Sequence, residues 1–180
     1  MSPESSMKSF LHPALFFLSW VFALIEFLIT AILVHNYDSN GYPTDSVRDR
    51  LRFLLFVSCW TLLFVPVYIA ANLRAPGRAI ASISSNLAFT SVTWLFWFSG
   101  AIAWTDALGG TLHCGDLFLQ NSVIEISIPY CGSLRAAQAF SWMILITFSA
   151  ILGYVGLSAA KARKAPGGLS GPMRETSTPA

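Results

Sequence analysis

Charged residues are scarce in this chain: they make up 11% of its 180 residues, against about 25% in a typical soluble domain. Hydrophobic residues make up 54%, and the mean hydropathy is +0.60. This composition is too apolar for a soluble globular domain. The net charge of +2 also leaves no basic surface of the kind that binds nucleic acid.

The common catalytic patterns are missing as well. The chain has no glycine-rich phosphate loop, no His-x-x-Glu-His helix and no Gly-x-Ser-x-Gly elbow. It also has no Asn-x-Ser/Thr sequon, so N-glycosylation is not expected. We therefore expect a protein without enzymatic activity and without a cofactor.

Four apolar runs are long enough to cross a bilayer, which takes roughly 20 helical residues. They cover residues 14–34, 53–73, 87–108 and 136–160. The first is too long for a signal peptide, and no small-residue cleavage site follows it, so it is expected to be retained. The chain is thus predicted to be an all-α, antiparallel transmembrane four-helix bundle over residues 13–160. A short segment, 1–12, precedes it, and a disordered tail, 161–180, follows it.

Polar and small residues within the runs follow helical spacing. In the third run they are Asn86, Thr90, Thr93, Trp97, Gly100 and Trp104, and in the first they are Ser19, Ala23, Glu26 and Thr30. The second run has a weaker stripe, Thr61, Val65, Tyr68 and Asn72, and the fourth has Gln138, Trp142, Ser149, Gly153, Gly156 and Ala160. Hydrocarbon offers such groups no hydrogen-bond partner, so the stripes should face other helices. We expect the small residues Gly100, Ser149, Gly153 and Gly156 to let helix backbones approach closely, with the face of Gly153 and Gly156 used either inside the bundle or for association with a further helix.

Local signals bound the helices. Pro13 suits the first turn of the first helix, and Ser46 with Asp49 resembles a capping box at the start of the second. Pro66 is expected to kink the second helix. Residues 74–78 predict a tight turn that makes the second and third helices antiparallel neighbours.

Lys and Arg favour both termini in the cytoplasm. That orientation puts seven of the eleven inside and four outside. The inner set is Lys8, Arg74, Arg78, Lys161, Arg163, Lys164 and Arg174, and the outer set is Arg48, Arg50, Arg52 and Arg135.

The same orientation places Cys114 and Cys131 on the oxidising side, where a disulfide persists. Bridged, they would close the loop 114–131, for which the chain-entropy model gives about 3 kcal/mol. Two free thiols are the alternative. A metal site that adds His113 and Asp116 is disfavoured, because the spacing matches no common zinc pattern. The third cysteine, Cys59, is expected to be a packed thiol.

Glu26 lies near the middle of the first run, and no Lys, Arg or His lies at a similar depth in the others. We expect it to be neutral and hydrogen-bonded to Thr, Asn or Ser on a facing stripe, as a helix-packing contact. The alternative is a proton or solute relay. Asn86 and Gln138 are the other intramembrane polar residues of interest.

Asp106 and Arg135 end the third run and begin the fourth, so an interfacial ion pair is predicted, with two solvated charges as the alternative. The cluster Lys161, Arg163 and Lys164 is expected to set topology and to attract anionic lipid modestly. Trp104 lies where an interfacial aromatic belt is expected, whereas Trp60, Trp94 and Trp97 lie deeper.

Several stretches resemble the MARVEL-domain proteins, most of all the small fungal branch. They are residues 23–26, 49–53 with 57–61, 95–101 and 136–140, together with the pair Cys114 and Cys131 in the second outer loop. The resemblance covers roughly residues 10–160. It implies a four-helix membrane bundle with cytoplasmic termini that organises lateral membrane domains, membrane apposition or vesicle traffic without enzymatic activity.

The expected function is therefore membrane organisation through lipid and helix–helix contacts, in the plasma membrane or in secretory or endosomal membranes. Expected partners are the bilayer, sterol-rich lipid, further copies of the chain or other membrane proteins, and not nucleic acid. The alternative is a small solute or proton transporter or channel that uses Glu26.

Overall fold

The computed structural model describes residues 3–42, 44–74, 82–110 and 130–162, and this part of the chain forms four helices. They are α1 (Pro3–Asn40), α2 (Asp45–Arg74), α3 (Ile83–Ala107) and α4 (Cys131–Ala162). Each contains a segment long and apolar enough to cross a membrane. The all-helical four-span bundle expected from the four apolar runs is confirmed.

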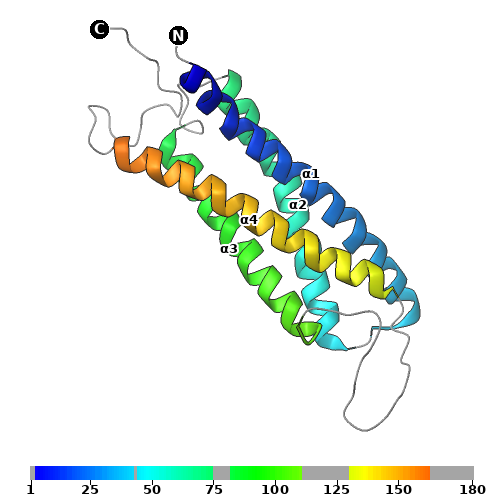
Figure 1. The fold of residues 1–180 in the computed structure, drawn as a ribbon. Coiled ribbons are helices and arrows are strands. Elements are labelled where there is room, and N and C mark those ends of the chain that lie inside the picture. Colours follow the sequence, from blue (N-terminus) through cyan, green and yellow to red (C-terminus); the bar gives the residue numbers. More distant parts are fainter. Residues whose placement is uncertain (1–2, 43, 75–81, 111–129, 163–180) are drawn as a thin grey trace, which may run out of the picture.

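The helices form a closed ring in which each has two neighbours (Figure 1). Helix α1 packs against α2 and α4, and α3 packs against the same two. Consecutive helices run antiparallel (Figure 1). The start of α1 therefore lies at the same end of the bundle as the ends of α2 and α4.

Two helix starts differ from expectation. Helix α1 begins at Pro3, so Pro13 is inside the helix and not in its first turn. Pro13 removes one backbone bond near the end of the bundle, where water can satisfy the freed carbonyl. Helix α2 is capped by Thr44, whose Oγ1 accepts from the Val47 backbone N–H at 3.2 Å. Ser46 therefore does not cap the helix. The expected turn at 75–78 and the tail from 163 lie outside the described residues.

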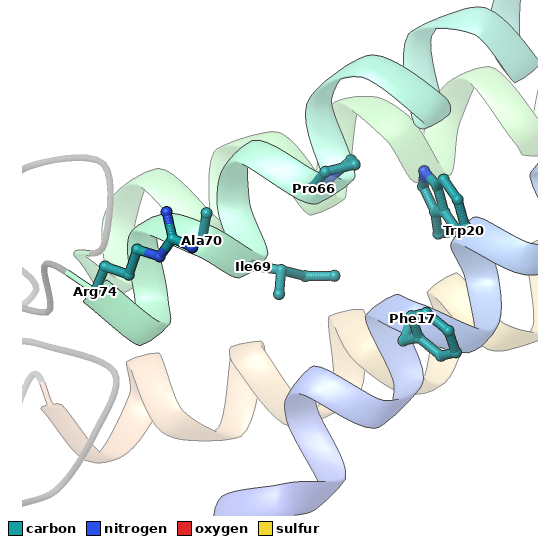
Figure 2. Close-up of a pocket in the computed structure, with 6 residues that line it drawn as sticks. All are labelled: Phe17, Trp20, Pro66, Ile69, Ala70 and Arg74. Carbon is teal, nitrogen blue, oxygen red and sulfur yellow. The ribbon is translucent and has the colours of Figure 1, made fainter.

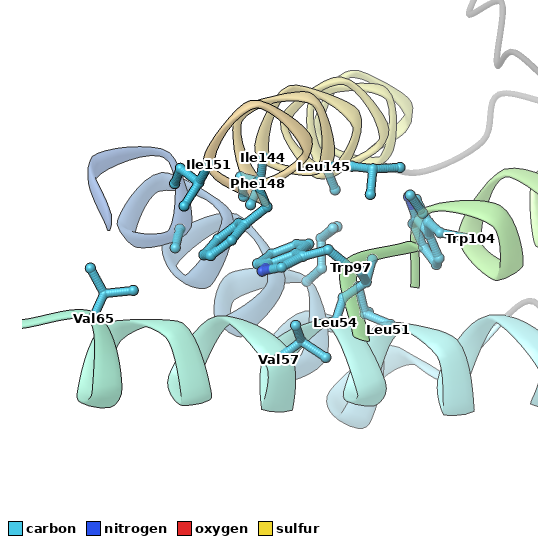
Figure 3. Packing of buried hydrophobic residues seen from close by; sticks show 14 of the residues in the cluster. Leu51, Leu54, Val57, Val65, Trp97, Trp104, Ile144, Leu145, Phe148 and Ile151 are labelled. Atoms are coloured by element: carbon cyan, nitrogen blue, oxygen red, sulfur yellow. The ribbon is translucent and has the colours of Figure 1, made fainter. Parts of the chain in front are cut away.

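Large side chains fill the centre of the bundle (Figure 3). Five of them are fully buried: Trp97 and Trp104 from α3, Phe148 from α4, and Leu51 and Leu54 from α2. The outer surface is also apolar: Leu63, Ile146 and Leu157 are 65–69% exposed, as expected of side chains that face lipid. Polar groups therefore have to find partners inside the bundle or at its two ends.

Candidate functional site

The polar stripes of α1 and α3 face the interior. All six residues of the α3 stripe are buried, whereas Ala88, Leu95, Phe98 and Ile102 on the opposite side are exposed. The four stripe residues of α1 are fully buried too. Gly100 lies against α2, where a Cβ on it would come within 3.0 Å of Leu54 Cδ2. The reasoning that lipid turns polar and small residues inward is confirmed for these two helices.

The stripe of α4 is divided: Gln138 near its start is buried, whereas Ser149, Gly153 and Ala160 further along are exposed. A Cβ on Gly153 or Gly156 would meet no atom within 4 Å. Close approach of helices at Gly153 and Gly156 therefore does not occur within the described bundle, and association of this face with another helix stays a prediction. The buried face of α4 carries Leu134, Ala137, Ser141, Ile144, Phe148, Ile151, Val155 and Ala159. Large apolar side chains such as Ile144 and Phe148 fill the space that the stripes of α1 and α3 leave at the centre, and the face with Gly153 lies outside.

Indole N–H groups are the recurrent hydrogen-bond donors between helices. The chain has six tryptophans, and each donates to a neighbouring helix. The α1–α2 interface has Trp20 to Leu62 O, and the α2–α3 interface has Trp60 to Thr93 Oγ1 and Trp97 to Thr61 Oγ1. The α3–α4 interface has Trp94 to Ser149 Oγ, Trp104 to Leu134 O and Trp142 to Thr105 Oγ1. These contacts measure 2.8–3.4 Å between donor and acceptor atoms.

Amide and hydroxyl pairs extend this pattern along α2 and α3. Asn72 and Asn86 exchange two side-chain hydrogen bonds of 3.0 and 3.3 Å. At the other end of α3, Gln138 Nε2 donates to Gly110 O at 2.8 Å and to Thr105 Oγ1 at 3.3 Å. The intramembrane residues Asn86 and Gln138 are thus placed at helix–helix contacts. This use of polar groups is typical of packing within a membrane.

Glu26 lacks the hydrogen-bond partners that most buried polar residues have; among the described residues, Thr90 Oγ1 is the other buried side-chain atom without one. Its side chain is fully buried, yet neither carboxyl oxygen has a hydrogen-bond partner among the described residues. The expected bond to a facing Thr, Asn or Ser is therefore absent from this part of the chain. Thr30, one turn away on the same helix, uses its hydroxyl to donate to the Glu26 backbone carbonyl at 2.8 Å. A carboxyl group without a partner in a low-dielectric core is expensive unless it is neutral.

Asp106 pairs with Arg50 of α2, so the predicted pair with Arg135 is wrong. The Arg50 Nη1 atom lies 2.7 Å from Asp106 Oδ2 and also donates to Ala103 O at 2.6 Å. Arg135 is exposed on α4. The cause is geometric: α3 adjoins both α2 and α4 at this end, and the face of α3 that carries Asp106 turns toward α2.

Two further arginines of α2 at this end of the bundle, Arg48 and Arg52, also pair. Arg52 Nη2 lies 3.0 Å from Asp38 Oδ1, and Arg48 Nη1 lies 2.9 Å from Asp45 Oδ1. The Tyr42 hydroxyl donates to Asp38 Oδ1 at 2.8 Å. The arginines in the first turns of α2 are therefore largely neutralised by neighbouring carboxylates.

The cysteine prediction is not tested by the described residues. Cys114 lies outside them, Cys131 opens α4, and Cys59 is a free, half-buried thiol within α2. The bridge between Cys114 and Cys131 stays a prediction. In the described part of the chain, no group of three or more His, Cys, Asp or Glu residues is placed to hold a metal ion.

Sequence reasoning missed the indole contacts and the role of Arg50. The sequence predicts that the tryptophans pack in the core or lie at the membrane interface. Their spacing does not indicate which residue of another helix accepts a hydrogen bond from each indole. Arg50 enters the sequence analysis only in the count of Lys and Arg residues on each side of the membrane. The available signal was that Arg50 lies near the start of α2 and Asp106 near the end of α3, which places both at the same end of an antiparallel bundle.

The comparison with protein families agrees with this architecture. The model of a membrane-associating domain, MARVEL, matches residues 9–154, which takes in most of the bundle.

Proposed function

We propose that this chain, which belongs to the MARVEL family of membrane-associating domains, organises its membrane laterally through contacts with lipid and with other membrane proteins, without enzymatic activity. Membrane apposition and vesicle traffic are the processes that such organisation would serve. The plasma membrane and the secretory or endosomal membranes are the proposed locations.

One observation carries this proposal: the bundle is apolar on the outside and filled on the inside. Exposed large hydrophobic residues occur on all four helices, among them Phe17, Phe56, Leu95 and Ile146. The centre is occupied by Trp97 at 0% exposure. Such a molecule acts on its surroundings through its outer surface, which supports an organiser more than a pathway for solutes.

Small residues on the outer face of α4 support association with a further helix. Gly153 and Gly156 leave their Cβ positions open, and two helices can approach closely where such residues meet. We propose this face for contacts with a second copy of the chain or with another membrane protein.

We further propose that both termini are cytoplasmic. The arginines near the connection of α1 and α2 are paired with carboxylates, as described above. Arg74 and Lys161, at the other end, have no described carboxylate within ion-pair distance. The side of the termini also holds seven of the eleven Lys and Arg residues of the chain, and an excess of Lys and Arg is the usual mark of the cytoplasmic side.

Energy transfer between labelled copies in vesicles tests the proposal. Donor- and acceptor-labelled chains at low surface density should transfer energy above the level of random mixing. Gly153→Leu should lower the transfer, because the added side chain blocks close approach. Ala88→Leu, which places the same leucine side chain on the exposed face of α3, is the control. Transfer at the random level for the unchanged protein would contradict the proposal.

A second candidate, a proton or solute transporter, is favoured by the unpartnered carboxyl group of Glu26. Its test is proton flux into vesicles that hold the protein and a pH-sensitive dye. Flux above that of empty vesicles, abolished by Glu26→Gln without loss of insertion, would favour the transporter. Equal leakage with and without the protein would remove this candidate.

A further inference from the structure

A groove on the outer face of the bundle lies between α1 and α2, toward the end of α2 (Figure 2). It has a volume of about 340 Å³ and is lined by Phe17, Trp20, Pro66, Ile69, Ala70 and Arg74. This volume is within the range of about 300–1,000 Å³ that is usual for small-ligand sites. The groove opens toward lipid, since Phe17 is 60% exposed and Ala70 is exposed.

Pro66 and Trp20 shape the groove together. Proline has no backbone N–H, so the carbonyl of Leu62, four residues earlier, lacks its usual helical donor. Trp20 Nε1 of α1 donates to that carbonyl at 3.3 Å. The indole is thereby fixed against α2 beside Pro66, and the groove extends from it along Ile69 and Ala70 (Figure 2).

The charge in the groove is not compensated. Among the described residues that line the groove, Arg74 is the charged one, and it lies exposed at the end of α2 (Figure 2). No described carboxylate is paired with it, in contrast to Arg48, Arg50 and Arg52 at the opposite end. Apolar walls that lead to a single cation match an acyl chain that leads to an anionic headgroup.

We propose that this groove binds one anionic phospholipid, with an acyl chain against Phe17, Trp20 and Ile69 and the headgroup at Arg74. The proposal rests on the proposed membrane-organising function and deepens it by naming a class of lipid. A cation near the membrane surface attracts anionic lipid through charge, and the walls add contacts that a smooth helix surface does not offer.

Native mass spectrometry of the full chain in detergent tests this proposal. The probes are phosphatidylserine and phosphatidylcholine with identical acyl chains, each added at the same concentration. The unchanged protein should retain one phosphatidylserine in preference to phosphatidylcholine. Arg74→Gln should lower phosphatidylserine retention about fivefold and bring it to the phosphatidylcholine level. Arg135→Gln, at an exposed cation of the opposite end, should leave the preference unchanged.

A second variant examines the walls. Ala70→Trp should fill the groove and reduce retention of both lipids, whereas Leu63→Trp, on the exposed face of the same helix, should not. Equal retention of the two lipids by the unchanged protein would overturn the proposal, as would a preference that survives Arg74→Gln. If Ala70→Trp releases a second copy of the chain and not a lipid, the groove is a contact between copies, and the proposal is overturned as well. Energy transfer between copies in pure phosphatidylcholine vesicles reports on membrane organisation independently of these outcomes.

Discussion

The hydrogen bond from Trp97 to Thr61 offers the sharpest test of how this bundle is held together. Both side chains are fully buried, and the Trp97 Nε1 atom lies 3.0 Å from Thr61 Oγ1. Thr61→Val keeps the size of the side chain but removes the acceptor, so the indole N–H is left without a partner. An orphaned buried donor costs about 1–3 kcal/mol, whereas interhelical hydrogen bonds in membranes contribute about 0.6 kcal/mol on average and at most about 1.7. We therefore expect the free energy of unfolding to fall by about 1–2 kcal/mol.

Thr147→Val is the matched control. Thr147 is also buried, and its hydroxyl donates to Met143 O one turn earlier, as that of Thr61 donates to Val57 O. Among the described residues it accepts no bond from another helix, so its replacement should cost under about 0.5 kcal/mol. Reversible unfolding in mixed micelles measures both variants. An equal loss of stability for the two would refute the claim that the bond between helices, and not the hydroxyl itself, is what stabilises the bundle.

Three further predictions concern single positions. Neutralising Arg50 or Asp106 should lower the unfolding free energy by under about 1 kcal/mol, because the side chains of the pair are 30% and 73% exposed; a double charge swap should restore it, and no recovery would argue against the pair. Gly100→Leu should destabilise the bundle by about 1–3 kcal/mol through overpacking, whereas Gly153→Leu should leave unfolding in micelles unchanged, so equal losses would refute the packing difference. Glu26→Gln should change the unfolding free energy by less than about 0.5 kcal/mol, as measured in the same micelles, because it replaces a neutral carboxyl group of the same shape; a large loss would show a charged or bonded Glu26.

The sequence predicts the fold well because few backbone structures can cross a membrane. Backbone polar groups in hydrocarbon require helices, and run length sets their number. The rotation of α1 and α3 about their axes was also predictable, since residues such as Asn86 and Glu26 have no place in lipid. These inferences need only one helix and its solvent.

The rotation of α4 was not predictable by the same rule. Gly153 and Phe148 are both acceptable to lipid, so lipid does not decide which one turns inward. The decision comes from the volume that the other three helices leave at the centre, and that volume is a property of the assembled bundle. The choice of Arg50 over Arg135 as partner of Asp106 depends on assembly in the same way, because both arginines lie at the correct membrane depth.

The four interfaces between neighbouring helices, here called seams, differ in the contacts that hold them, and this difference determines where the bundle opens most easily. Each of the six indole bonds joins helices that are consecutive in the chain. The seam between α1 and α4, which closes the ring, is lined by ring contacts such as Phe16 with Phe148 and Phe22 with Phe140, whose centroids lie 6.4 and 6.0 Å apart. In lipid, apolar contacts gain no hydrophobic free energy, because acyl chains offer similar packing. The α1–α4 seam is thus the one that lipid tails compete for most directly, whereas the indole bonds keep the other three seams closed. Changes in the surrounding lipid should therefore act on this bundle through α1, the helix that also carries one wall of the groove at Arg74.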